Sequence, residues 1–111
     1  MKIEWLYEAQ AEYRAVLRYY RENVGLPYAR RFADRVLEEV GSLSSFPLVG
    51  VNKDGTLLAK RGFRALFISN YAVIYRIDED AVRIFHFVDA RTNYIYNLFG
   101  LNAPSDDSDD D

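Results

Sequence analysis

The chain has 111 residues, of which 50% are hydrophobic and 28% are charged, a composition that favours one globular domain. It contains no cysteine, which excludes disulfides, thiolate metal sites and cysteine nucleophiles and favours a reducing compartment. No apolar run approaches the ~18 residues of a membrane span, and the first residues lack the layout of a signal peptide. We therefore expect a cytoplasmic protein that makes no membrane contact.

The acidic residues are concentrated at one end of the chain. Overall, 14 Lys and Arg stand against 17 Asp and Glu, which gives a net charge of −3. Five of these acids lie within residues 106–111, and without them the rest of the chain has 12 acidic and 14 basic residues, a charge of +2. We predict a folded domain over residues 1–100 and a disordered acidic tail over residues 101–111.

The first half of the chain predicts one strand and two helices. Residues 1–5 alternate apolar and charged side chains, which indicates a short strand. From about Leu6, apolar residues recur every three or four positions, which indicates an amphipathic helix that ends at Gly25. Pro27 suits the first turn of a second helix, and a connection this short makes the pair an antiparallel hairpin. The second helix is expected to bury Ala29, Phe32, Ala33, Val36, Leu37, Val40 and Leu43.

The second half predicts an antiparallel β-meander. We expect strands at residues 56–61, 63–69, 71–77 and 82–88, of which the last three are rich in aromatic and β-branched side chains, with short turns between the strands. Residues 93–99 are expected to form a short closing helix. The predicted fold is α+β: the helices cover one face of the sheet and the N-terminal strand pairs at its edge. In the last strand, one face is expected to hold Val82, Ile84, His86 and Val88, and the other Arg83, Phe85 and Phe87.

Several kinds of catalytic site find no support in the sequence. Nucleophilic catalysis by a serine–histidine pair is not supported, because no serine lies in a glycine-bounded turn and His86 is the single histidine. The compact acidic groups, residues 78–80 and the tail, are typical of solvated loops rather than metal sites. No glycine-rich phosphate loop occurs. We therefore expect neither a metal nor a cofactor.

The remaining candidates are basic and aromatic residues in the predicted sheet. Arginine binds phosphate through two parallel hydrogen bonds, so a sheet that bears several arginines could bind RNA or an acidic protein. The alternative is a solvated face with snorkelling side chains. His86, between Phe85 and Phe87, fits a structural histidine better than a catalytic one, and Tyr94 could meet a phosphate or pack the last helix. The basic set is Lys60, Arg61, Arg64, Arg76, Arg83, His86 and Arg91.

The order of these elements and three sequence motifs resemble the RelE/ParE superfamily of toxins from bacterial type II toxin–antitoxin systems. The likeness covers essentially residues 1–100. The motifs are Gly-Phe-Arg at 62–64, Asn-Tyr-Ala-Val-Ile-Tyr-Arg-Ile at 70–77, and Val-Arg-Ile-Phe-His-Phe-Val-Asp-Ala-Arg at 82–91.

This resemblance implies one of two activities: RelE-like cleavage of mRNA on the ribosome, or ParE-like inhibition of DNA gyrase. Arg64 and Arg76 fall where the superfamily usually has basic residues, and Arg91 matches the arginine of its closing motif. Where nucleolytic relatives have a histidine or tyrosine, this chain has Asp89 and Ala90. The ParE-like activity therefore fits better.

The resemblance also implies site residues and partners. For a nucleolytic protein, the catalytic candidates are His86, Arg64, Arg91 and Tyr94. For target binding, they are Lys60, Arg61, Arg64, Arg76, Arg83 and Arg91. The expected partners are a cognate antitoxin, in a hetero-oligomer, and either DNA gyrase or the ribosome with mRNA. A third interpretation is an attenuated toxin fold that serves as an interaction module.

Overall fold

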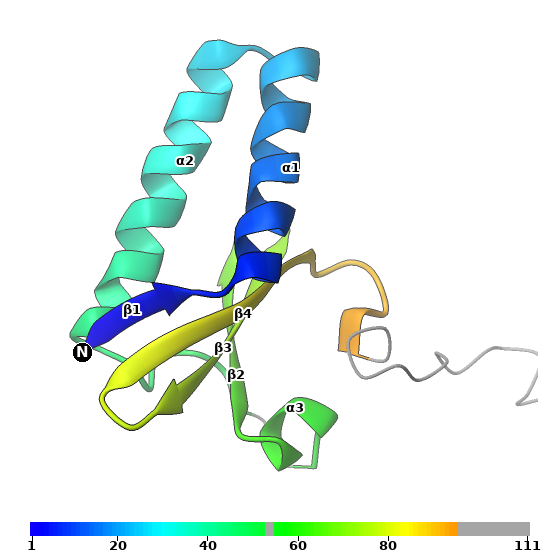
Figure 1. The fold of residues 1–111 in the computed structure, drawn as a ribbon. Coiled ribbons are helices and arrows are strands. Elements are labelled where there is room, and N and C mark those ends of the chain that lie inside the picture. The colour runs from blue at the N-terminus through cyan, green and yellow to red at the C-terminus, as the bar shows by residue number, and fades with distance from the viewer. Residues whose placement is uncertain (53–54, 96–111) are drawn as a thin grey trace, which may run out of the picture.

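A computed structural model describes residues 1–52 and 55–95 (Figure 1). Its elements follow the expected order of strand, helical hairpin and meander, with one additional short helix before the meander. They are β1 (Lys2–Trp5), α1 (Tyr7–Asn23), α2 (Leu26–Gly41), a 3-10 turn η1 (Ser42–Ser44), α3 (Leu57–Lys60), β2 (Phe63–Ile68), β3 (Tyr71–Asp78) and β4 (Ala81–Asp89).

The sheet has the strand order β1-β4-β3-β2. The pairs β2–β3 and β3–β4 are antiparallel, whereas β1 lies parallel to β4, from which the helical hairpin separates it in sequence. Parallel neighbours need such a crossover connection. The predicted α+β fold, with the N-terminal strand at the edge of a meander, is confirmed.

The hairpin of α1 and α2 stands on one face of the sheet, with its two helices side by side (Figure 1). Gly25 makes the connection with φ of +135°, a conformation that disfavours other residues, and Pro27 lies in the first turn of α2. The apolar stripe of α2 packs with β3 and β4 in the main core. Leu37, expected in that stripe, is 60% exposed because it lies at the flank of α2, where it lines a hollow beside Ile3 and Trp5.

The opposite face of the sheet carries a second, smaller core. Leu58 of α3 packs there against Phe63, Ala65 and Ile74. The predicted strand over residues 56–61 is wrong, because the Thr56 side chain accepts a hydrogen bond from the Ala59 N–H at 3.1 Å and caps the short helix α3. The four residues of α3 are helix formers and include no β-branched or aromatic side chain, so their local preference is helical.

A β-bulge in β4 changes the predicted distribution of side chains. Tyr75 pairs with Ile84 and Ile74 pairs with His86, so Phe85 is an additional residue between them. Beyond this point the alternation shifts by one position. Phe87 therefore joins Ile84 in the main core beneath the helices, and the expectation that it shares a face with Arg83 and Phe85 is wrong.

The end of the chain is described only in part. Tyr94 and Ile95 are helical, at the start of the predicted closing helix, and both pack on the second core. The other residues of that helix and the predicted acidic tail over residues 101–111 lie outside the described residues. Within residues 1–52 and 55–95, no helix is long and apolar enough to cross a bilayer.

Candidate functional site

Two of the predicted arginines lie side by side on the open face of the sheet, the face opposite the helical hairpin. Arg76 of β3 and Arg83 of β4 are partners in the strand register. The Arg76 guanidinium lies over two aromatic rings, 4.8 Å from the Phe85 centroid and 5.1 Å from the Phe63 centroid. Such stacking fixes the orientation of an arginine that remains partly exposed.

Carboxylates of the same chain pair with both of these guanidinium groups. Asp78 accepts hydrogen bonds from Arg76 Nε at 2.9 Å and from Arg76 Nη2 at 3.1 Å, and it accepts another from Arg83 at 3.3 Å. Glu4 of β1 accepts a hydrogen bond from Arg83 Nε at 3.2 Å. The hydrogen bond from Arg76 lowers the pKa of the Asp78 carboxyl group. Arg76, Arg83, Asp78 and Glu4 therefore form one connected set of ion pairs, here called the open-face network, which has no net charge.

Arg91 is paired in the same way just beyond β4. Its Nε and Nη2 donate to the two carboxylate oxygens of Asp89 at 3.0 and 2.7 Å, and its backbone N–H donates to the same side chain at 2.9 Å. These bonds lower the pKa of the Asp89 carboxyl group to about 2. The cation of the closing motif is therefore balanced by the acid two residues before it.

Arg64 lies on a different face from Arg76 and Arg83. It pairs in register with Tyr75, whose ring is in the main core, and its guanidinium points to the loop after η1. There Arg64 Nη1 donates to the carbonyl oxygens of Leu48 and Gly50, at 3.3 and 3.1 Å. These two hydrogen bonds hold a backbone loop, and the expected grouping of Arg64 with the other target-binding arginines does not occur.

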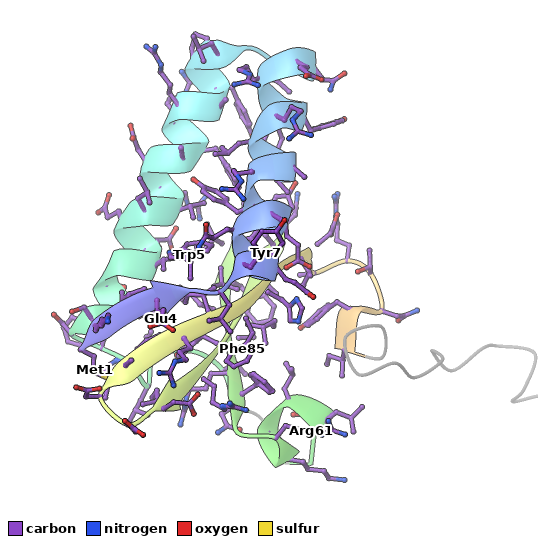
Figure 2. All side chains as sticks on the ribbon, viewed as in Figure 1. Met1, Glu4, Trp5, Tyr7, Arg61 and Phe85 are labelled. Carbon is purple, nitrogen blue, oxygen red and sulfur yellow. The ribbon has the colours of Figure 1, made fainter. Side chains whose placement is uncertain are left out.

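Lys60 and Arg61 lie at the end of α3, and both are exposed. Figure 2 shows Arg61 on this short helix, well separated from Glu4 on β1. The predicted basic set is therefore dispersed over the fold: Arg76 and Arg83 lie in the open-face network, Lys60 and Arg61 at the end of α3, Arg64 beside the loop after η1, Arg91 beyond β4, and His86 beside α1.

His86 contacts the first helix rather than the arginines. Its Nδ1 lies 3.2 Å from Glu12 Oε1 of α1, and Glu8 is more distant at 4.0 Å. The same Glu12 oxygen accepts the backbone N–H of Phe87 at 3.0 Å. This arrangement supports the structural role favoured for His86, because its carboxylate partner already serves to join α1 to β4.

The four candidate catalytic side chains are not assembled into a site. Tyr94 packs in the second core, and burial raises the pKa of its hydroxyl group. In the described part of the chain, no hydrogen bond or ion pair joins any two of His86, Arg64, Arg91 and Tyr94. Within the same residues, no group of three or more His, Asp or Glu side chains is placed to hold a metal ion.

Comparison with known proteins identifies the family. The family model described as "ParE toxin of type II toxin-antitoxin system, parDE" matches residues 3–94, most of the chain. The chain belongs to the ParE toxin family. No curated protein sequence matches it.

Solved structures show the same fold. One, described as "Chromosomal ParDE TA system from P. aeruginosa", is 18% identical, with a TM-score of 0.66 over 80% of this chain and 95% of the other. A second, described as "YoeB-YefM complex from Staphylococcus aureus", is 17% identical, with a TM-score of 0.50 over 78% of this chain and 93% of the other. The family match confirms the resemblance to the RelE/ParE superfamily, and these structures confirm the fold.

The acidic partners of the arginines and of His86 in this ParE-family chain were missed by the sequence analysis, although two of the four carry a local signal. Asp78 follows Arg76 by two positions, so strand alternation places both on one face. Asp89 and Arg91 have the same spacing. Glu4 and Glu12 have no comparable signal, because their contacts with β4 join residues more than seventy positions apart.

Proposed function

We propose that this chain is a growth-inhibiting toxin that acts, in the manner of ParE, by binding DNA gyrase, and that a cognate antitoxin neutralises it. Its action would take place in the cytoplasm, where gyrase and its DNA are found. This proposal is supported by membership of the ParE toxin family and by the hydrogen bonds that pair the arginines with groups of the same chain.

The pairing of arginines with carboxylates is the observation that carries the proposal. Cleavage of RNA through its 2′-hydroxyl needs a base, an acid and a cation that stabilises the phosphorane. Arg76, Arg83 and Arg91 each bind a carboxylate of this chain, and Arg64 binds backbone carbonyls. A phosphate would have to displace these partners. A protein target needs no such exchange.

The alternative is a RelE-like mRNA endonuclease, and the pair of His86 and Glu12 favours it. A histidine held by a carboxylate is a common general base. Against this, the Glu12 oxygen nearest His86 also caps a strand N–H, and the His86 side chain is only 20% exposed. An attenuated fold that serves as an interaction module is the third possibility.

For the antitoxin, we propose the groove between the two helices as the contact surface. Leu17, Leu26, Ala29 and Ala33 line a hollow of about 180 Å³ there, flanked by Arg21 and Arg30. An amphipathic helix with acidic side chains fits such a groove by helix-in-groove packing. The product is a toxin–antitoxin hetero-oligomer, and the P. aeruginosa relative is likewise described as a ParDE TA system.

The test is induced expression of the chain with and without the protein encoded next to it. We expect growth arrest that the co-expressed antitoxin relieves, a DNA-damage response in the arrested cells, and intact mRNA. Cuts at fixed codon positions in ribosome-bound mRNA would select the endonuclease instead. Normal growth of cells in which expression of the chain is confirmed would contradict both toxin activities and favour the interaction module.

A further inference from the structure

The loop after η1 presents a cluster of apolar side chains to solvent. Phe46, Leu48 and Val49 are 66%, 64% and 59% exposed, and together with Ser45 and Pro47 they line a hollow of about 390 Å³. No charged residue occurs from position 42 to position 52, in a chain of which 28% is charged. We call residues 45–51 the apolar loop. Exposed apolar clusters of this kind mark interaction surfaces.

The apolar loop is held firmly by the sheet. The hydroxyl of Tyr75, whose side chain is buried, donates to the Pro47 carbonyl at 2.7 Å and accepts from the Gly50 N–H at 2.8 Å. Val51 then pairs with Ala65 of β2 through hydrogen bonds of 2.8 and 3.0 Å. Together with Arg64, these contacts fix the loop before any partner binds, which reduces the entropy cost of binding.

The same contacts determine what kind of partner fits. The carbonyl groups of Pro47, Leu48 and Gly50 are already bound by Tyr75 and Arg64, so the loop turns apolar side chains outward while these backbone acceptors face inward. A nucleic acid or an acidic peptide would find no charge to pair with on residues 42–52. An uncharged, apolar pocket on a protein matches the surface, because burial of its side chains leaves none of these carbonyls without a hydrogen bond.

We propose that the apolar loop is the surface by which this chain docks into an apolar pocket of its protein target, DNA gyrase. The inference rests on the proposed function and adds the contact surface and its chemistry. It separates target binding from antitoxin binding, since the apolar loop and the groove between α1 and α2 share no residue. It also gives Arg64 and Tyr75 the role of positioning residues.

The test compares a double variant, Phe46→Ser with Leu48→Ser, against the matched control Leu37→Ser. Leu37 is exposed to a similar degree but lies on α2, away from the apolar loop. All three side chains are exposed, so folding should be retained, and circular dichroism verifies this. We expect the double variant to bind purified DNA gyrase at least about tenfold more weakly than wild type, a loss of ~1.4 kcal/mol or more in binding free energy. The control should bind within about twofold of wild type.

Two further measurements test whether the apolar loop instead contacts the antitoxin or a second copy of the chain: binding of the purified antitoxin, and sedimentation equilibrium. We expect the double variant to bind the antitoxin as wild type does, and the wild type to remain monomeric. A double variant that binds gyrase as tightly as wild type does overturns the inference. If that variant has lost antitoxin binding, the loop contacts the antitoxin. If instead the wild type is a dimer and the variant is a monomer, the loop contacts a second copy of the chain. Failure of wild type to bind gyrase contradicts the proposed function itself, and the inference falls with it.

Discussion

Glu12 of α1 accepts a hydrogen bond from the backbone N–H of Phe87 in β4, at 3.0 Å, three residues beyond Ile84, the last residue of β4 that pairs with β1. Beyond Ile84, β1 no longer pairs with β4, and the Glu12 side chain of the first helix binds the backbone of β4 where a neighbouring strand would. Edges of sheets are commonly covered in this way. The contact thereby sets the position of the helical hairpin relative to the sheet.

Glu12→Ala should therefore destabilise the fold, because it leaves a partly buried N–H without a partner. We expect a loss of about 1–3 kcal/mol in the free energy of unfolding, the usual cost of such a group. Glu12→Gln retains an acceptor oxygen and should restore much of this loss. Glu8→Ala, which removes a more exposed carboxylate near His86, is the control and should have little effect. Urea denaturation measures all three, and equal losses for Glu8→Ala and Glu12→Ala would contradict the assignment.

A second prediction concerns the anchor of the apolar loop. A Cβ atom at Gly50 would lie 2.6 Å from Cε1 of the Tyr75 ring, which is buried and has no room to move. We expect Gly50→Ala to cost about 1–3 kcal/mol in unfolding free energy, as overpacking does. Gly41→Ala is the control, because a Cβ there meets no atom within 4 Å. Thermal denaturation should show a lower melting temperature for Gly50→Ala alone.

The pair of Asp89 and Arg91 predicts a particular pH dependence. Hydrogen bonds from Arg91 lower the pKa of Asp89 from 3.8 to about 2. A carboxyl group with a lowered pKa stabilises the fold above its unfolded pKa, and this contribution disappears as the pH falls from near 4 to about 2. In Arg91→Ala, the midpoint of Asp89 measured by NMR titration should rise toward 3.8. A midpoint that is the same in wild type and variant would show that Arg91 does not hold this carboxylate.

The open-face network predicts how the protein responds to polyanions. Asp78 is the carboxylate partner of Arg76, whereas Arg83 also pairs with Glu4, so Asp78→Asn should free the Arg76 cation and tighten the binding of single-stranded RNA at low salt. A further phosphate that the freed cation neutralises should steepen the dependence of log K on log salt by about 0.7. Asp34→Asn removes the same charge from α2, outside the network, and serves as the control. Equal increases in affinity for the two variants would indicate an effect of net charge alone.

The sequence predicted most of the fold because its signals are local. Helical periodicity located α1 and α2, Gly25 and Pro27 marked the turn between them, and the strands of the meander followed from their composition. The cap at Thr56 was also local and was missed, although the residues after it are helix formers, because the four residues of α3 are too few to show a helical period. The bulge at Phe85 leaves no comparable mark in the sequence, because it depends on the pairing of β4 with β3.

The candidate site was predicted less well, because its chemistry depends on contacts between distant residues. Sequence alone identified the arginines but not that Glu4 pairs with Arg83 across the sheet. Nor could it show that Arg64 binds the carbonyl of Gly50. A basic residue in a strand is interpreted as a free cation until its partner is known, and most of these arginines have their partners within the fold.

The most direct test of this account is the supercoiling activity of purified DNA gyrase in the presence of the purified chain, with ribosome-bound mRNA assayed in parallel. We expect supercoiling to fall as the chain is added, restored by the antitoxin, while the mRNA stays uncut. Cleavage of the mRNA at fixed codon positions, with gyrase activity unchanged, would contradict the account.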